Sequence, residues 1–222
     1  MRITSVESIP LRLPVKTPLV ESGGVFSEFN HVLVKLHADN GCIGLSEVEA
    51  YPSFERHGVE TPEGIVAVLR DHLFPCVVDS TPFSITEIWQ RMDAVVTGYL
   101  RVKAAIDIAL HDLVATHLGV PVYDLLGGRQ RDSYVVEGVG YGISIDEPER
   151  VAAVAKSAVD RGYRQLELKA GDACSMRDVQ RLAAVREAIG PDIPIKIDFN
   201  GFYVHHIFDC APVEGYVANY CA

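Results

Sequence analysis

The sequence predicts an α+β unit over residues 1–128, followed by the start of a parallel β/α fold. Three strand-like segments come first and three helix-like segments follow them, which is the order of an α+β unit. After Gly128 the pattern becomes strand, helix, strand, helix, strand, at intervals of roughly 30 residues. From the residues alone, these repeats begin either a (β/α) barrel or a doubly wound sheet.

The first unit opens with apolar and polar residues that alternate over 2–13, 30–37 and 42–50, as in half-buried strands. The second and third strands are joined by Ala38-Asp39-Asn40-Gly41, in which Asn-Gly favours a hairpin turn. The first and second are separated by the polar segment 20–25. We expect this segment to be either a mobile connection or a lid over a ligand.

Helix signals fill the rest of the first unit. Thr61 is an expected N-cap, because Pro62 follows it at the first helical position. Ser84 is the expected cap of a second helix. The third helix is predicted from about Leu100 to Leu118, with Gly119 as its stop.

The second part of the chain repeats strands and helices. Strands are predicted over 133–141, 164–168 and 193–197, and helices over 147–160 and 175–188. We therefore expect parallel strands with crossover helices between them.

Two charged residues stand where the second and third of these strands end. Lys169 follows one apolar run and Asp198 ends the next. Functional side chains of parallel β/α folds collect at the carboxyl ends of the strands, so we expect these two residues to lie close together. A lysine beside a carboxylate suits proton abstraction next to a metal-held anion. Taken singly, a lysine at a strand end is usually solvated, and an aspartate before Asn-Gly usually forms a turn.

Composition excludes several classes of protein. A formal net charge of -10 argues against a nucleic-acid surface or an acidic-membrane anchor. No apolar run approaches the roughly 20 residues of a membrane span, and the N-terminus lacks the apolar core of a signal peptide. The five cysteines are odd in number and form no CxxC pair, so we expect a reduced, cytoplasmic protein.

Several stretches resemble the mandelate racemase and muconate-lactonizing branch of the enolase superfamily, over about residues 1–203. The segments 104–113 and 118–128 resemble the junction between the capping domain and the barrel of that family. Leu168-Lys169-Ala170-Gly171 resembles the second half of its K-x-K motif, and Ile197-Asp198-Phe199-Asn200 resembles its D-x-N motif. The resemblance implies an α+β capping domain over a modified (β/α)₇β TIM-like barrel.

The resemblance also implies a reaction. A proton is removed from the carbon next to a carboxylate and Mg²⁺ holds the resulting enediolate, as in racemases, epimerases, cycloisomerases and dehydratases. It implies that Lys169 is the acid/base group, Asp198 the first metal ligand and Asn200 a supporting group near the metal. Lys169 must be neutral to act as a base.

In this architecture, loops of the capping domain contact the distal part of a small, carboxylate-bearing substrate. The resemblance places two segments there, residues 20–26 and residues 51–57. The substrate-contacting residues expected in the first are Glu21, Ser22, Val25 and Phe26. The resemblance also implies that complete members of the family assemble into homo-oligomers.

The sequence departs from the family pattern in two ways. Glu167 stands where the leading lysine of K-x-K is expected, and its carboxylate would repel an anionic substrate and raise the pKa of Lys169. An unusual or cationic substrate would accommodate it. The 94 residues from Arg129 to Ala222 are also fewer than the roughly 250 of a full barrel. They accommodate three strands, and none of the later metal carboxylates has a counterpart.

We therefore expect barrel repeats over 129–203 and an aberrant segment over 204–222. That segment contains no lysine or arginine, and Pro212 and Gly215 interrupt any helical period. The simplest hypothesis is a frameshift or truncation near Tyr203. The chain as it stands is then expected to be inactive, and the alternative reading is a non-catalytic remnant or interaction module that keeps the capping domain.

Overall fold

The computed structural model describes residues 1–50, 60–172 and 175–200. The expected substrate loop 51–57 and the segment 204–222 lie outside these described residues, so both expectations stay predictions. No helix within the described ranges is long and apolar enough to cross a membrane.

The chain divides into two compact units, and each has its own hydrophobic core. The first unit contains residues 1–14 and 28–132, and the second contains residues 15–27 together with the chain from 133 onward. The expected division at Gly128 therefore lies close to the observed change of unit, but residues 15–27 group with the second unit.

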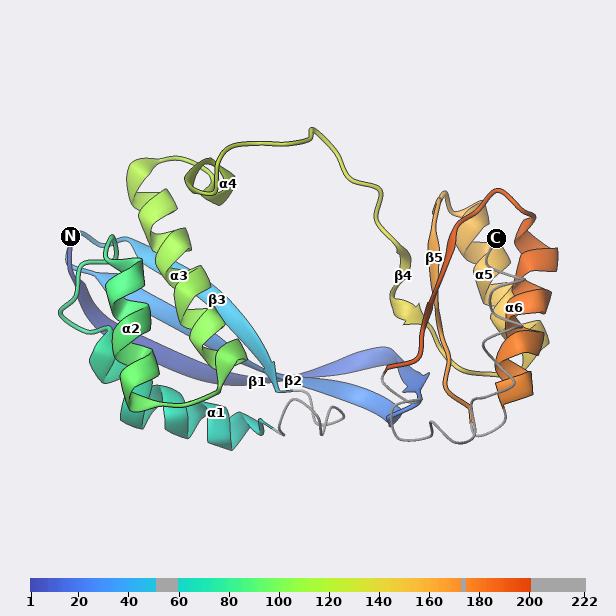
Figure 1. The fold of residues 1–222 in the computed structure, drawn as a ribbon, viewed down its shortest axis with the longest axis horizontal. Coiled ribbons are helices and arrows are strands. Elements are labelled where there is room, and N and C mark those ends of the chain that lie inside the picture. The colour runs from blue at the N-terminus through green and yellow to red at the C-terminus, as the bar shows by residue number, and fades with distance from the viewer. Residues whose placement is uncertain (51–59, 173–174, 201–222) are drawn as a thin grey trace. The chain divides into compact units, whose positions relative to one another are not determined.

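The first sheet is a meander with the strand order β1-β2-β3 (Figure 1). Its strands are β1 (Ile3–Glu21), β2 (Gly24–Ala38) and β3 (Ile43–Ala50). Strands β2 and β3 pair antiparallel through the predicted hairpin, where Gly41 has a φ of +84°. Glycine adopts a positive φ without steric cost, which is why the Asn40-Gly41 pair predicted this turn correctly.

Strands β1 and β2 extend well beyond the predicted bounds and meet in a two-residue turn at Ser22 and Gly23. The prediction of a loop over 20–25 was therefore wrong. That prediction rested on the polar residues and glycines between Val20 and Val25, which are typical of a loop. Strand β1 is an edge strand that contains prolines at 10, 14 and 18. Residues four apart direct their backbone nitrogens to the same side, so these prolines fit an outer edge that needs no N–H donor.

The helices of the first unit follow the sheet, and their bounds are α1 (Pro62–Val68), the π-turn η2 (Leu69–Leu73), the 3₁₀ turn η3 (Phe74–Cys76), α2 (Ile85–Val95), α3 (Leu100–Leu118) and α4 (Val122–Leu125). The Thr61 cap is confirmed, because its Oγ1 accepts a hydrogen bond of 3.1 Å from the Gly64 N–H. Ser84 occupies the cap position of α2 without a side-chain cap bond. Helix α3 ends at Gly119 in the left-handed conformation, as predicted.

Helix α3 lies directly on strand β3. A Cβ added to Gly44 would come within 2.1 Å of the Ala109 carbonyl oxygen, so only glycine permits this approach. The Asp112 carboxylate accepts a 2.8 Å hydrogen bond from the Leu45 N–H and satisfies a donor on the edge strand. Helix and sheet thereby enclose the apolar core of this unit.

The second unit is built from β4 (Gly138–Ile143), α5 (Pro148–Asp160), β5 (Leu166–Lys169), α6 (Ser175–Ile189) and β6 (Ile195–Asp198). Its strands are parallel, in the order β4-β5-β6. Helices α5 and α6 pack together and share one core with the sheet (Figure 1). In the described part of this unit the strands are sequential and parallel and both helices share one core, as at the beginning of a (β/α) barrel or in one half of a doubly wound sheet.

Candidate active site

Strand β5 places its charged side chains on the face opposite the helices. Leu166 and Leu168 belong to the core shared with α5 and α6. Because side chains alternate along a strand, Glu167 and Lys169 point to the other face. Both side chains are nevertheless buried.

Parallel pairing with β6 adds two more charged residues to that face. Glu167 lies opposite Lys196, and Lys169 lies opposite Asp198. The structure thus brings Lys169 and Asp198 together, as the argument from strand ends predicted. Their roles in catalysis stay predictions.

The four side chains form a chain of alternating charge. The Lys169 ammonium lies 2.7 Å from Glu167 Oε1 and 2.7 Å from Asp198 Oδ2. The other oxygen of Glu167 accepts a hydrogen bond from Lys196, whose Nζ lies 3.5 Å from Glu137 Oε2. Each cation therefore lies between two carboxylates.

This arrangement favours the charged form of Lys169. Burial alone would lower the pKa of the amine, because it removes the ammonium from water. The hydrogen bonds and charges of Asp198 and Glu167 outweigh burial and raise the pKa above its ordinary value. Lys169 is therefore an ammonium at neutral pH, with the direction of shift that was expected from a carboxylate at position 167.

Glu167 is not a free negative charge. Burial favours its neutral form, but the hydrogen bonds from Lys169 and Lys196 prevail and lower its pKa. Both carboxylate oxygens are engaged by ammonium groups. The repulsion of an anionic substrate that we expected from this residue is thus largely neutralised by its own neighbours.

Asp198 and Asn200 form a tight turn at the end of β6. The Asn200 N–H donates a 2.9 Å hydrogen bond to Asp198 Oδ1, and Asn200 adopts a φ of +46°. Burial would raise the pKa of Asp198, but the contacts with Lys169 and with this N–H lower it. The Asn200 side-chain oxygen is buried and has no hydrogen-bond partner among the described residues. It is thus an available acceptor beside the carboxylate.

Gly142, at the carboxyl end of β4, makes room for the cluster. Its φ is +100°, and a Cβ there would lie 3.1 Å from Glu167 Oε1 and 3.2 Å from Lys169 Cε. Sequence analysis missed this residue, although a glycine at the end of a predicted strand is a recognised sign of close approach.

A second buried network fixes the segment that follows Lys169. The Arg181 side chain is only 6% exposed and donates to Asp178 (2.8 Å), to Asp172 and to the carbonyl of Asp146. The other Asp178 oxygen accepts the N–H groups of Gly171 (2.9 Å) and of Asp172 (3.2 Å). The loop after β5 is therefore anchored to α6, a contact that the sequence pattern did not indicate.

The tip of the β1–β2 hairpin packs on the same unit. The Ile145 N–H donates to the Val20 carbonyl (2.9 Å), and the Val20 N–H donates to Ser144 Oγ (3.1 Å). Ser22 Oγ donates to the carbonyl of Phe199 (3.0 Å), between Asp198 and Asn200. Three hydrogen bonds thus fix the tip beside the ends of β4 and β6.

The four residues expected to contact substrate occupy different environments on this tip. Glu21 is buried, with 5% of its surface exposed, and Phe26 is half-buried. Ser22 lies beside the end of β6 through its bond to Phe199, whereas Val25 is 68% exposed. Ser22 is hydrogen-bonded to the residue between Asp198 and Asn200, and all four assignments stay predictions.

The described residues do not by themselves fit Mg²⁺. Within them there is no group of three histidine, cysteine, aspartate or glutamate side chains placed to share a metal ion. Asp198 offers one carboxylate, and its two oxygens are already engaged by Lys169 and by the N–H of Asn200. Mg²⁺ prefers several oxygen ligands in octahedral geometry, so one carboxylate is insufficient.

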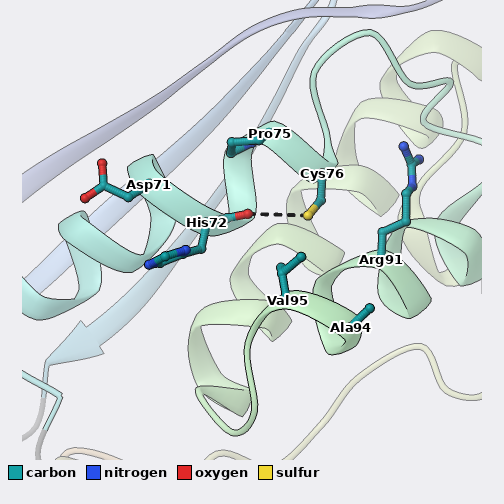
Figure 2. Close-up of a pocket in the computed structure, with 7 residues that line it drawn as sticks. All are labelled: Asp71, His72, Pro75, Cys76, Arg91, Ala94 and Val95. Atoms are coloured by element: carbon teal, nitrogen blue, oxygen red, sulfur yellow. Dashed lines mark hydrogen bonds between the residues drawn. The ribbon is translucent and has the colours of Figure 1, made fainter.

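A hollow of about 470 Å³ lies in the first unit (Figure 2). It is lined by Asp71, His72, Pro75, Cys76, Arg91, Ala94 and Val95. The Cys76 thiol donates to the carbonyl of His72, and its burial raises its pKa against the opposing charge of Arg91. A protonated thiol is a poor nucleophile, so Cys76 is not activated for catalysis in this hollow.

Comparison with known proteins gives two family matches. Residues 3–127 match the mandelate racemase/muconate lactonizing enzyme N-terminal domain, and residues 150–206 match the enolase C-terminal domain-like family. The first match covers most of the predicted α+β unit, and the second begins within the predicted β/α repeats.

Individual relatives give the same result. The chain is 36% identical over 201 residues to an N-succinyl-L-Arg/Lys racemase of Bacillus cereus, which covers 90% of this chain and 52% of the racemase. A dipeptide epimerase of Cytophaga hutchinsonii, solved with Mg and D-Ala-L-Val, is 31% identical with a TM-score of 0.84. That match covers 97% of this chain and 57% of the epimerase.

The structure of a 2-chloromuconate cycloisomerase of Rhodococcus opacus matches with a TM-score of 0.89 and 25% sequence identity. The match covers 100% of this chain and 58% of the cycloisomerase chain. The chain thus spans about half the length of the curated relatives it matches.

Proposed function

Because the chain belongs to the mandelate racemase/muconate lactonizing enzyme family of the enolase superfamily, we propose that it removes or returns a proton at the carbon next to a carboxylate. The proposed reaction class is that of racemases, epimerases, cycloisomerases and dehydratases. The observation that carries the proposal is the contact of 2.7 Å between Lys169 and Asp198 at the ends of adjacent parallel strands.

Lys169 is the proposed acid/base residue. In the charged form that its neighbours favour, the ammonium donates a proton to a planar, enolate-like carbon, and it attracts the negative charge that develops there. To act as a base in the other direction, it must first lose a proton to water or to a second group.

Asp198 orients the ammonium and is the proposed first metal ligand, with Asn200 as a supporting group. The described residues supply only this one carboxylate, so Mg²⁺ binding needs further ligands from outside the described ranges.

The proposed substrate is a small molecule that carries a carboxylate. Relatives include proteins named as racemases of N-succinylated arginine and lysine, and as epimerases of dipeptides. Neutralisation of Glu167 by two lysines is compatible with an anionic group near the cluster. Ser22 on the hairpin tip is the proposed contact with the part of the substrate away from the reacting carbon.

A second function, a non-catalytic remnant or interaction module, is favoured by one specific observation. Lys169 is held by two carboxylates and its pKa is raised, which opposes proton abstraction. In this alternative the cluster is a buried ion-pair network that stabilises the fold.

Solvent deuterium exchange distinguishes the two functions. The chain is incubated in D₂O with Mg²⁺ and either N-succinyl-L-lysine or a set of dipeptides, and the α-proton signal is followed by NMR. The proposed function predicts loss of that signal with the wild-type chain and none with the Lys169→Arg variant. The control variant Lys156→Arg changes an exposed lysine on α5 and should exchange at the wild-type rate. If the α-proton signal of the substrate is kept equally with the wild-type chain and with Lys169→Arg, the non-catalytic alternative is favoured.

A further inference from the structure

Lys196 occupies the outer end of the charge chain. Its side chain is 55% exposed, and its Nζ contacts one oxygen of Glu167 and lies 3.5 Å from Glu137. Among the described residues, Lys196 is linked to Lys169 through Glu167, and its charge also helps to lower the pKa of Asp198. It is therefore well placed to affect Lys169 indirectly, at a site that tolerates substitution better than the buried members do.

The carboxylate of Glu167 links the two lysines. Its two oxygens point to different ammonium groups, one to Lys169 and one to Lys196. These two contacts define the plane of the carboxylate, since a planar group bound at both oxygens cannot rotate freely. The register between β5 and β6 places Lys196 next to Glu167, because the two residues are direct partners across these parallel strands.

Loss of Lys196 would leave the outer oxygen of Glu167 without its cation. The Glu167 side chain is only 10% exposed, so water has little access to replace the lost donor. The carboxylate is then expected to rotate and share both oxygens with Lys169, or to move toward solvent. Either movement would displace the Lys169 ammonium relative to Asp198, because Lys169 contacts both carboxylates.

We propose that Lys196 is a positioning residue for Lys169: by fixing the carboxylate of Glu167, it holds the Lys169 ammonium in place against Asp198. The catalytic meaning of this role rests on the proposed function. The placement itself does not, because it can be measured without turnover.

The test uses the full chain labelled with ¹³C at the lysine ε-carbons. The Lys169 signal in the ¹H–¹³C spectrum is assigned by its disappearance in Lys169→Arg. Spectra are then compared for Lys196→Met, which removes the charge, and for Lys196→Arg, which keeps it. Lys156→Met is the matched control, because Lys156 is an exposed lysine whose contact is Asp160 on its own helix.

The expected result is a displaced Lys169 signal in Lys196→Met, a signal near the wild-type position in Lys196→Arg and an unchanged signal in Lys156→Met. An unmoved Lys169 signal in a folded Lys196→Met variant would overturn the proposal. Folding is checked by the backbone amide spectrum, and Lys196→Gln replaces the methionine variant if that protein does not fold.

A kinetic measurement separates this proposal from the proposed function. Where the wild-type chain exchanges the α-proton, Lys196→Met should lower kcat by roughly 10- to 100-fold, the range found for groups that orient metal ligands, with little change in KM. A displaced signal without any exchange by the wild-type chain would support the positioning role and count against the proposed function.

Discussion

Replacing Gly142 by alanine should displace the strand-end cluster. The added Cβ would lie 3.1 Å from Glu167 Oε1 and 3.2 Å from both Glu167 Cγ and Lys169 Cε. These side-chain atoms cannot move aside cheaply, since each belongs to an ion pair of 2.7 Å. The variant should therefore lose stability and shift the Lys169 ε-carbon signal together.

The magnitude has two parts. A non-glycine residue at the φ of +100° costs about 1–2 kcal/mol, and overpacking against the fixed side chains adds about 1–3 kcal/mol. Gly162 provides a matched control, because its φ is +103° and no atom lies within 4 Å of its added Cβ. Gly162→Ala should show only the first part.

The assay is urea-induced unfolding of both variants and the wild-type chain, followed by far-UV circular dichroism. Gly142→Ala should be less stable than Gly162→Ala by about 1 kcal/mol or more. Equal losses in the two variants, with an unmoved Lys169 signal, would refute the packing argument.

Three further outcomes are expected. Thr61→Ala should destabilise the first unit by about 1 kcal/mol through loss of the N-cap bond, measured by urea unfolding with the fluorescence of Trp89, the single tryptophan. Arg181→Met should lower the free energy of unfolding by about 3 kcal/mol, because it leaves buried carboxylates without their cation. A loss below about 0.5 kcal/mol, measured by urea unfolding, would contradict that reasoning. Stability should also depend on pH in both directions. The raised pKa of Lys169 stabilises the fold fully below about pH 10.4, and this contribution is lost as the pH rises through the raised pKa. The lowered pKa of Asp198 stabilises the fold fully above about pH 3.9, and this contribution is lost as the pH falls through the lowered pKa. Lys169→Met should flatten the alkaline loss in a pH series of thermal unfolding.

Much of the second unit was predictable because its signals are local. Apolar runs flanked by helical periods fixed the strand–helix order, and sequential parallel strands then required Lys169 and Asp198 to approach at one edge. The helix caps at Thr61 and Gly119 were predictable for the same reason, since a cap depends on a few neighbouring residues.

The parts that were not predictable depend on pairing between distant residues. The engagement of Glu167 by Lys196 requires the register of β5 with β6, which no local pattern reveals. The length of β1 was missed because the polar residues and glycines around the hairpin tip resemble a longer loop. The contact of Ser22 with Phe199 joins residues far apart in the chain.

A double-mutant cycle on Lys169 and Asp198 tests the contact on which both proposals depend. The free energy of unfolding is measured for Lys169→Met, for Asp198→Asn, for the double variant and for the wild-type chain. A direct ion pair predicts a coupling energy of about 1 kcal/mol or more. Additivity of the two single effects within about 0.5 kcal/mol would show that the residues do not interact and would contradict the site as described.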